Sequence, residues 1–439
     1  MGMEQYMTTD AQVILNANLI PGGTVGSPWR RSDAPGSHFI TIDHYIEVAK
    51  IAERGLLDAI FLADSVDFGS REWNSPGRLL DPLIAQAVLS AHTERIGFVA
   101  TASTSYNDPY NLARQFASLA AASSDRVAWN IVVSGGDPAA RNYSREAALP
   151  KAERYERAAE FIEVVTKLWG SWADGALVAD KTTGEYLDPT LIDPVDHVGK
   201  HFQVQGPLKA PPLSHGRPVL VQAGASSYGE DLAATYADVV YSPHLNADSA
   251  RERRTALRKL AAAKGREPNS IKLIPGLMTV IADTEEAALR REEELADLIP
   301  ESVQILNLAR TLEVPVESLT LDAPIPWDLM PGDDTARGSR GQRSVFIENV
   351  RSRGLDTRGA ARLLAAGSGH ARVVGTPEQV ADVIETWFTE GAVDGFNIMV
   401  DELPDGLEVF VDHVVPLLQK RGLHRTEYRG ATLREHYGL

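Results

Sequence analysis

The chain of 439 residues alternates short apolar runs with longer segments of helical periodicity, and this alternation constrains the fold most strongly. Runs rich in β-branched residues predict eight strands, at residues 12–19, 56–62, 95–100, 127–133, 218–223, 238–242, 271–281 and 395–400. Apolar residues at helical spacing predict helices between them, at residues 42–54, 79–92, 109–122, 151–169, 229–236, 251–264, 378–390 and 407–419. Such alternation is typical of parallel β/α folds, and eight units favour a TIM (β/α)8 barrel over an open sheet.

Two stretches interrupt the alternation. Residues 173–213 are rich in Pro, Gly and Asp, and their segment 199–207 has the pattern of half a hairpin. Residues 283–374 are too long for one β/α loop and contain two further predicted helices, at 285–298 and 344–354. An insertion of this size beside the strand ends could be a lid, a surface decoration or a subunit contact. We therefore expect one TIM-barrel domain over residues 11–439 with these two insertions, preceded by a flexible tail at residues 1–10.

Composition excludes several classes of function. A net charge of −17 without a basic stripe argues against nucleic acid and anionic membrane surfaces as partners. The absence of cysteine excludes disulfides, thiolate metal sites and a cysteine nucleophile. The eleven histidines show no HExxH or similar spacing, so no metal site is predicted, and Walker A, GxGxxG and GxSxG motifs are absent. Without a signal-like or membrane-spanning apolar run, a soluble cytoplasmic protein is the expectation.

Polar side chains collect where the predicted strands end. Asn130 interrupts an otherwise apolar strand, although a single buried amide more often only ties a loop to its strand. The set consists mostly of neutral donors and acceptors: Asn18, Asp64, Ser103, Thr104, Asn130, Ser134, Ser226, Ser227 and His244. Carboxyl ends of parallel strands meet at one face of a barrel, so this set suits a large polar ligand. It offers no obvious pair of carboxylates for glycoside hydrolysis.

Two smaller features of the sequence allow two interpretations each. Ser226 and Ser227 precede a predicted helix, where they could cradle a phosphate or simply cap the helix. Lys151 and Tyr155 lie one helical turn apart and share a helix face, but a tyrosine there could equally be core and a lysine solvated.

Several separate stretches together resemble one family. They are FLADS (61–65), TERIGFVATAST (93–104), DRVAWNIVVS (125–134), ARNY (140–143), ERYERAAEF (153–161), VGKHFQVQGPL (198–208), PVLVQAGAS (218–226), VVGTPEQVAD (373–382) and RTEYRGATLREHYGL (425–439). In this order they resemble the bacterial luciferase-like superfamily, in particular its branch of nitrilotriacetate, EDTA, alkane and dibenzothiophene-sulfone monooxygenases. The resemblance spans nearly the whole chain and is specific for the family, not for a substrate.

The resemblance implies a TIM barrel that binds reduced FMN delivered by a separate flavin reductase. Dioxygen would add to the flavin, and the resulting hydroperoxide would oxygenate a small organic substrate; family members are usually homodimers or homotetramers. Carried onto this sequence, the FMN phosphate would meet Tyr155, Ser226 and Ser227, with Lys151 as a further charge partner. The isoalloxazine ring and ribityl chain would lie along Asp64, Ser103, Thr104 and Asn130. A flavin hydroperoxide needs a dry cleft, which favours the lid interpretation of residues 283–374.

The sequence departs from the family pattern in three places. The first loop keeps Trp29 and Arg30 but lacks the histidine usual there. Lys151 replaces a common histidine, and Glu230 stands where an arginine is usual, which removes a positive charge near the expected phosphate. No catalytic residue can therefore be assigned, and Trp29, Arg30, Asn142 and His244 are candidates for the substrate pocket.

Other interpretations stay open at this point. Arg30 and the adjacent Arg31 would suit an anionic substrate, but surface arginines are common. Within the superfamily, a deazaflavin-dependent oxidoreductase that transfers hydride is the alternative. A flavin-binding barrel that has lost its chemistry is another, because the first-loop histidine is absent.

Overall fold

The computed structural model describes residues 12–31, 33–68, 75–224, 226–331, 340–365 and 370–439. The expected tail at residues 1–10 lies outside the described residues. Among the described residues, no helix is both long enough and apolar enough to span a bilayer.

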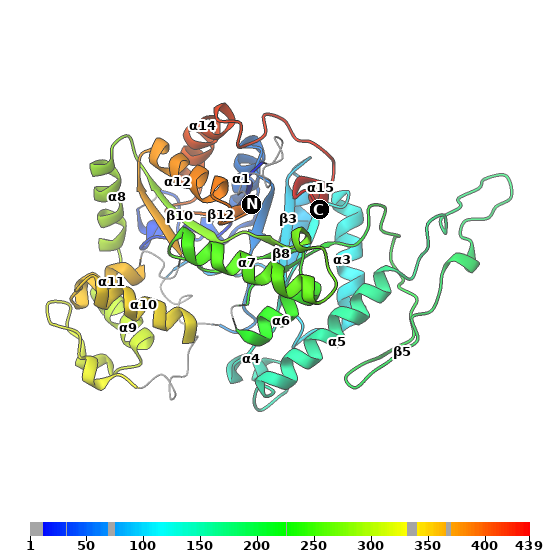
Figure 1. The fold of residues 1–439 in the computed structure, drawn as a ribbon, viewed down its shortest axis with the longest axis horizontal. Coiled ribbons are helices and arrows are strands. Elements are labelled where there is room, and N and C mark those ends of the chain that lie inside the picture. Colours follow the sequence, from blue (N-terminus) through cyan, green and yellow to red (C-terminus); the bar gives the residue numbers. More distant parts are fainter. Residues whose placement is uncertain (1–11, 32, 69–74, 225, 332–339, 366–369) are drawn as a thin grey trace, which may run out of the picture.

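A parallel sheet closes into a barrel at the centre of the molecule (Figure 1). Its strands are β1 (Ile14–Asn18), β2 (Ala59–Leu62), β3 (Gly97–Ser103), β4 (Val127–Val132), β7 (Val219–Gln222), β8 (Val239–Val240), β9 (Lys272–Leu273), β10 (Gly276–Ile281) and β12 (Gly395–Val400). Strands β9 and β10 occupy one position of the barrel: β9 pairs with β8, and β10, which follows after two residues, pairs with β12. Because β12 pairs with β1, the ring closes with eight strand positions. The predicted TIM barrel is confirmed.

One strand of the sheet was not predicted. Strand β11 (Ala371–Gly375) pairs in parallel with β10 and lies within the segment that the sequence assigns to the large insertion. Its burial does not alternate, because Arg372 is exposed and the next two residues, Val373 and Val374, are both half-buried, so the period of two is weak.

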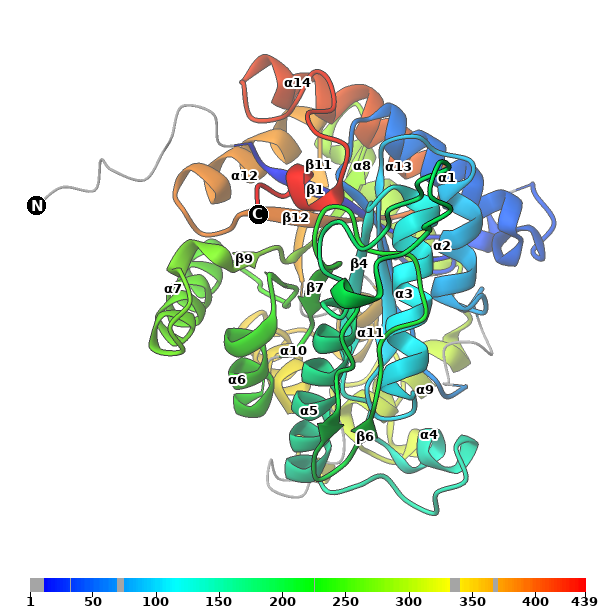
Figure 2. The same cartoon turned by 90° about the vertical axis from the view of Figure 1, so that its right-hand side faces the viewer.

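Helices cover the outside of the barrel (Figures 1 and 2). They are α1 (Ile42–Arg54), α2 (Pro82–Ser90), α3 (Pro109–Ser123), α5 (Lys151–Trp169), α6 (Ser227–Tyr236), α7 (Ala247–Ala263), α12 (Pro377–Thr389), α13 (Asp405–Val409) and α14 (Val415–Lys420). Helices α1 and α5 begin and end where the sequence predicts. The predicted last helix is instead divided by a π-helical turn at Phe410–Val414, just before Pro416, whose ring cannot donate the next backbone hydrogen bond.

The large insertion forms a helical body with its own core. It contains α8 (Glu285–Asp297), α9 (Glu301–Leu312), α10 (Arg340–Ser352) and α11 (Thr357–Ala365), of which α9 and α11 were not predicted. Leu308, Leu312, Phe346 and Val350 are among the buried residues of a hydrophobic cluster separate from the barrel core. This body lies on one side of the barrel, and the antiparallel hairpin of β5 (His197–Val198) and β6 (Gln203–Val204) lies on the opposite side (Figure 1).

The C-terminal segment closes the amino-terminal end of the barrel (Figure 2). Leu433, in the short unpredicted helix α15 (Leu433–His436), and Tyr437 are buried in one cluster with inward-facing strand residues. The Tyr437 hydroxyl donates to Asn16 Oδ1 at 3.0 Å, and Arg425 forms an ion pair with the fully buried Asp58. Any ligand of the barrel must therefore enter from the opposite end, where the strands finish.

Candidate functional site

The barrel interior changes from apolar to polar toward the carboxyl ends of the strands. An apolar cluster with Ile14, Ala59, Val99 and Ala128 shows which side of each strand faces the barrel axis. Side chains alternate along a strand, so the same side also carries Asn18, Thr101, Ser103, Asn130, Tyr241 and Asn397. Most of these polar residues are at least nine-tenths buried, and they line the part of the barrel above its closed floor.

Three inward-facing amides have oxygens without partners. Asn130 Nδ2 donates to Thr101 Oγ1 at 2.8 Å, but its Oδ1 has no hydrogen-bond partner among the described residues. The same holds for Oδ1 of Asn18 and of Asn397. A buried acceptor left unpaired costs about 1–3 kcal/mol. Three of them around one axis leave the interior able to accept hydrogen bonds from a bound molecule.

The two predicted residues at the end of β3 differ in orientation. Ser103 faces the axis, where its Oγ accepts hydrogen bonds from Ser134 Oγ at 2.7 Å and from the Ser105 N–H at 3.1 Å. Thr104 is fully buried, and its hydroxyl donates to the Val132 carbonyl at 3.2 Å. Thr104 thus holds β3 against β4, while Ser103 presents its oxygen to the interior.

Asp64 is the carboxylate at the end of β2. Its pKa is raised to about 6, mainly by burial and also by the charge of Asp81, while the Ser65 N–H and Arg78 oppose the shift. Helix α4 (Asp137–Asn142), which was not predicted, packs beside it, because Asn142 Nδ2 donates to the Val66 carbonyl at 3.1 Å. The Asn142 amide therefore supports the loop that carries Asp64.

The structure brings Lys151 and Tyr155 to the first turn of α6. Ser226 caps this helix by accepting from the Gly229 N–H at 3.3 Å, and Ser227 is its first residue. The Tyr155 and Tyr228 rings stack with centroids 5.6 Å apart, and Lys151 Nζ lies 5.7 Å from the Tyr228 centroid. A helix amino terminus with a lysine and two hydroxyls beside it fits a phosphate group.

An arginine from another helix lies near this helix start. Arg253 of α7 forms an ion pair with Glu230 and donates to the Gly224 carbonyl at 3.2 Å. The acidic residue at position 230 is therefore neutralised, and a guanidinium lies next to the segment that precedes α6. Sequence reasoning missed Arg253 because it lies 23 residues away from Glu230.

A tyrosine and two neutral histidines lie on the side of β8. Tyr241 Oη lies 3.2 Å from His370 Nε2 and 3.7 Å from Met399 Sδ. His244 contacts Ser242 Oγ at 2.8 Å and Ser249 Oγ at 3.3 Å. Burial lowers the pKa of both His244 and His370 to about 4, so both rings are uncharged at neutral pH. Neither Tyr241 nor His370 was predicted, since His370 precedes the unpredicted strand β11.

The first loop is bound to the insertion. The N–H groups of Gly26 and Ser27 donate to the carbonyls of Ala365 and Leu295, both at 3.3 Å. Arg30, which with Trp29 belongs to the 3-10 turn Pro28–Arg30, donates to the Leu298 carbonyl. These contacts place the first loop and the insertion together beside the strand ends.

Two carboxylates at the end of β12 were also missed. Asp401 and Glu402 are buried, and Arg291 of α8 forms ion pairs with both. Arg31 reaches Glu402 at 3.4 Å. The two carboxylates are neutralised by arginines and join the insertion to the barrel, and Arg31 is engaged there instead of being free for an anionic substrate.

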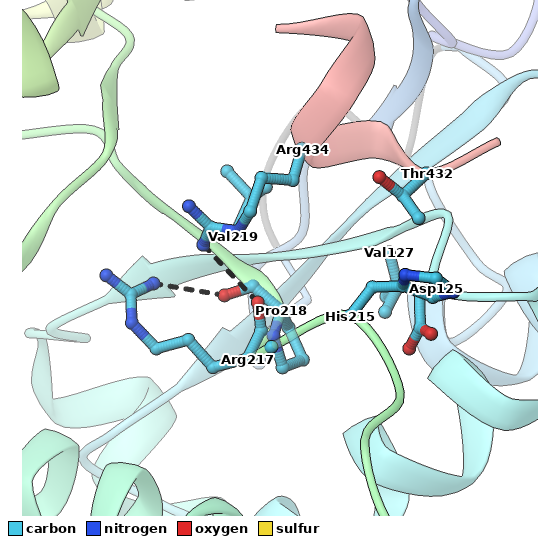
Figure 3. Close-up of a pocket in the computed structure, with 9 residues that line it drawn as sticks. Asp125, Val127, His215, Arg217, Pro218, Val219, Thr432 and Arg434 are labelled. Carbon is cyan, nitrogen blue, oxygen red and sulfur yellow. Dashed lines mark hydrogen bonds between the residues drawn. The ribbon is translucent and has the colours of Figure 1, made fainter. Parts of the chain in front are cut away.

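A small pocket lies at the other end of the barrel (Figure 3). It is lined by the residues around the starts of β4 and β7, among them Asp125 and Arg217, and by Thr432 and Arg434 of the C-terminal segment. TIM-barrel sites are built at the carboxyl ends of the strands, so this pocket is not the candidate site.

Comparison with known proteins agrees with this geometry. Residues 24–395 match the model of the family described as luciferase-like monooxygenase. The chain is 41% identical to N-acetyl-S-(2-succino)cysteine monooxygenase of Bacillus subtilis (strain 168), over 98% of this chain and 97% of that protein. It is 39% identical to nitrilotriacetate monooxygenase component A of Aminobacter aminovorans, over 94% of this chain and 93% of that protein. A crystal structure of a riboflavin lyase with modified FMN and riboflavin matches with a TM-score of 0.83 at 30% identity, over 98% of this chain and 96% of the lyase chain. The chain belongs to the family of luciferase-like monooxygenases, which confirms the resemblance seen in its sequence.

Proposed function

We propose that the chain is the oxygenase of a two-component system, which takes reduced FMN from a separate flavin reductase and oxygenates a small organic substrate with dioxygen. The name of the Aminobacter relative, component A, supports a second component. The riboflavin lyase structure supports FMN as the flavin, because it holds a modified FMN on the same fold. The observation that carries the proposal is that the amide oxygens of Asn18, Asn130 and Asn397, above a closed barrel floor, have no hydrogen-bond partner in the part of the chain that the structure describes.

The residues present fit the two ends of FMN. The phosphate would lie at the start of α6, against Ser226, Ser227, Tyr155 and Lys151. The flavin ring and ribityl chain would run over the strand ends, where the oxygens of Asn130 and Ser103 would accept hydrogen bonds from ligand N–H and O–H groups.

The chain contributes binding, orientation and exclusion of water. When bound, reduced FMN reacts with dioxygen and supplies the oxygen atom for the substrate. The first loop and the insertion, joined by the backbone contacts of Gly26 and Ser27, keep water away from that reaction. The neutral rings of His244 and His370 and the Tyr241 hydroxyl offer hydrogen bonds without adding charge.

Anaerobic titration with photoreduced FMN, followed by rapid mixing with oxygenated buffer, tests the proposal. We expect tighter binding of reduced than of oxidised FMN, and then a transient flavin absorbance distinct from that of the oxidised cofactor. Failure to bind either redox form would refute the proposal. Tight binding without the transient would favour a flavin-binding barrel that lacks chemistry, and selective binding of a reduced deazaflavin would favour hydride transfer.

The substrate is sought in a coupled assay with a generic flavin reductase and ¹⁸O₂. N-acetyl-S-(2-succino)cysteine and nitrilotriacetate are the first compounds to try, because the two relatives are named for them. Product that carries one ¹⁸O atom identifies the substrate. A homodimer or homotetramer remains our expectation, to be measured by analytical ultracentrifugation.

A further inference from the structure

Three side chains with metal-ligating atoms meet at the start of α1, where the first loop ends. His44 and Glu47 lie three residues apart on one face of α1, and His38 belongs to the 3-10 turn His38–Ile40 just before the helix. One ligating atom from each residue lies within 4.8 Å of those from the other two. His38 Nε2 is 3.8 Å from Glu47 Oε2, and the two imidazole centroids are 5.2 Å apart.

His44 is the residue that needs a further partner. Its side chain is fully buried, yet neither ring nitrogen has a hydrogen-bond partner among the described residues. The neighbouring Phe39 ring packs edge-on at 5.3 Å and offers no acceptor. Buried polar groups are normally paired, and an unpaired one costs about 1–3 kcal/mol. His38 and Glu47 are partly and largely exposed, so an ion can reach the cluster from solvent.

We propose that His38, His44 and Glu47 bind one divalent transition-metal ion, with zinc the best match. Two imidazoles and one carboxylate form a donor set that Zn²⁺ accepts with water in its remaining position, whereas Mg²⁺ and Ca²⁺ prefer oxygen ligands alone. Zn–ligand distances of about 2.0–2.1 Å put donor atoms roughly 3.4 Å apart in a tetrahedron. The three ligating atoms now lie within 4.8 Å of one another, and rotation of the Glu47 and partly exposed His38 side chains would bring them to this shorter separation.

The spacing H-x5-H-x2-E explains why the sequence predicts no metal site. It matches none of the usual metal motifs, and only the turn before α1 brings His38 back over the helix. The turn ends the first loop, in which the Trp29 ring lies close to Gly36. A bound ion would join this end of the loop to α1 and so stabilise the loop.

Calorimetric titration of the metal-free protein with ZnCl₂ tests the site, with Co²⁺ absorption spectra to report imidazole ligands. Chelating resin removes metal beforehand. We expect one Zn²⁺ per chain, a higher melting temperature with zinc, and at least a tenfold weaker affinity for both His38→Ala and Glu47→Gln. Both substitutions lie at the surface, so the variants remain folded enough to test.

His92→Ala is the matched control, because His92 is an exposed histidine outside the cluster. Its zinc affinity should equal that of the unmodified chain. Absence of zinc binding would overturn the proposal. Equal zinc affinity in His38→Ala, Glu47→Gln and the unmodified chain would also overturn it, since the ion would then bind elsewhere. Neither readout involves flavin, so the result is independent of the proposed oxygenase function.

Discussion

Replacement of Asn130 by alanine tests whether this amide binds the flavin or only supports the fold. The change removes an acceptor that has no partner among the described residues, together with the Nδ2 donor to Thr101. If Oδ1 accepts a hydrogen bond from FMN, its loss costs about 0.5–1.5 kcal/mol of binding free energy. The dissociation constant of reduced FMN should therefore rise roughly 2- to 13-fold.

The same substitution should change the stability of the ligand-free chain little. The lost hydrogen bond to Thr101 is offset because an unpaired buried oxygen is removed with it, and Thr101 Oγ1 keeps its bond to the Leu62 carbonyl at 2.7 Å. We expect the free energy of unfolding in urea to fall by less than about 1 kcal/mol.

Gln86→Ala is the control, for which we expect lower stability and unchanged FMN affinity. Gln86 is a fully buried amide on α2, and its Nε2 donates to the Val99 carbonyl at 2.8 Å, outside the barrel interior. Its truncation should lower stability by about 1–3 kcal/mol and leave the affinity for FMN unchanged. Isothermal titration under anaerobic conditions and urea unfolding measure both quantities. If Asn130→Ala lowers stability and not affinity, Asn130 is only a structural amide and the proposed placement of the flavin is wrong.

Three further substitutions test other parts of the structure. Ser226→Ala with Ser227→Ala should weaken FMN binding several-fold and leave riboflavin binding unchanged, since riboflavin lacks the phosphate; equal affinities for FMN before and after would contradict the phosphate assignment. Arg425→Met leaves the buried Asp58 carboxylate without its ion-pair partner and should lower the unfolding free energy at pH 7 by about 3–5 kcal/mol, with partial recovery when Asp58→Asn is added. Burial raises the pKa of Asp64 from 3.8 to about 6, so its ionisation disfavours the folded state between these pH values. The Asp64→Asn variant should therefore gain melting temperature relative to the unmodified chain as pH rises from 4 to 7, and a constant difference would show that the Asp64 pKa is not raised.

The sequence predicts the barrel well because its strands are apolar, buried and separated by helices with clear ends. Helix α3, for example, starts at Pro109 behind the capping Asp108, which accepts from two backbone N–H groups. Strand β11 escapes prediction because an exposed Arg372 interrupts its apolar pattern. Helices and strands are predicted from capping residues and from the periodicity of apolar residues, and the prediction fails where that periodicity is short or mixed.

The sequence predicted only those residues of the candidate site that lie at the ends of strands. Asn130 and Ser103 follow from strand periodicity, whereas Arg253 and His370 come from α7 and from the residue before β11. Their contacts join residues far apart in the chain, which one sequence read locally cannot reveal. Arg253 is a case in point, since its guanidinium reaches the start of α6 from another helix and pairs there with Glu230.

The contacts of the first loop limit how the insertion can act as a lid. Gly26 has φ +67°, and a Cβ atom there would lie 1.9 Å from the Leu295 carbonyl oxygen, so the loop backbone lies directly against α8. Opening at this point would break the Gly26 and Ser27 backbone hydrogen bonds and also the ion pairs of Arg291 with Asp401 and Glu402. The ends of α8 and α11 are therefore a fixed wall of the site. Helices α9 and α10 share a hydrophobic cluster with Ala360 and Ala361 of α11, so we expect any motion that admits substrate to pivot this body about the fixed end of α11.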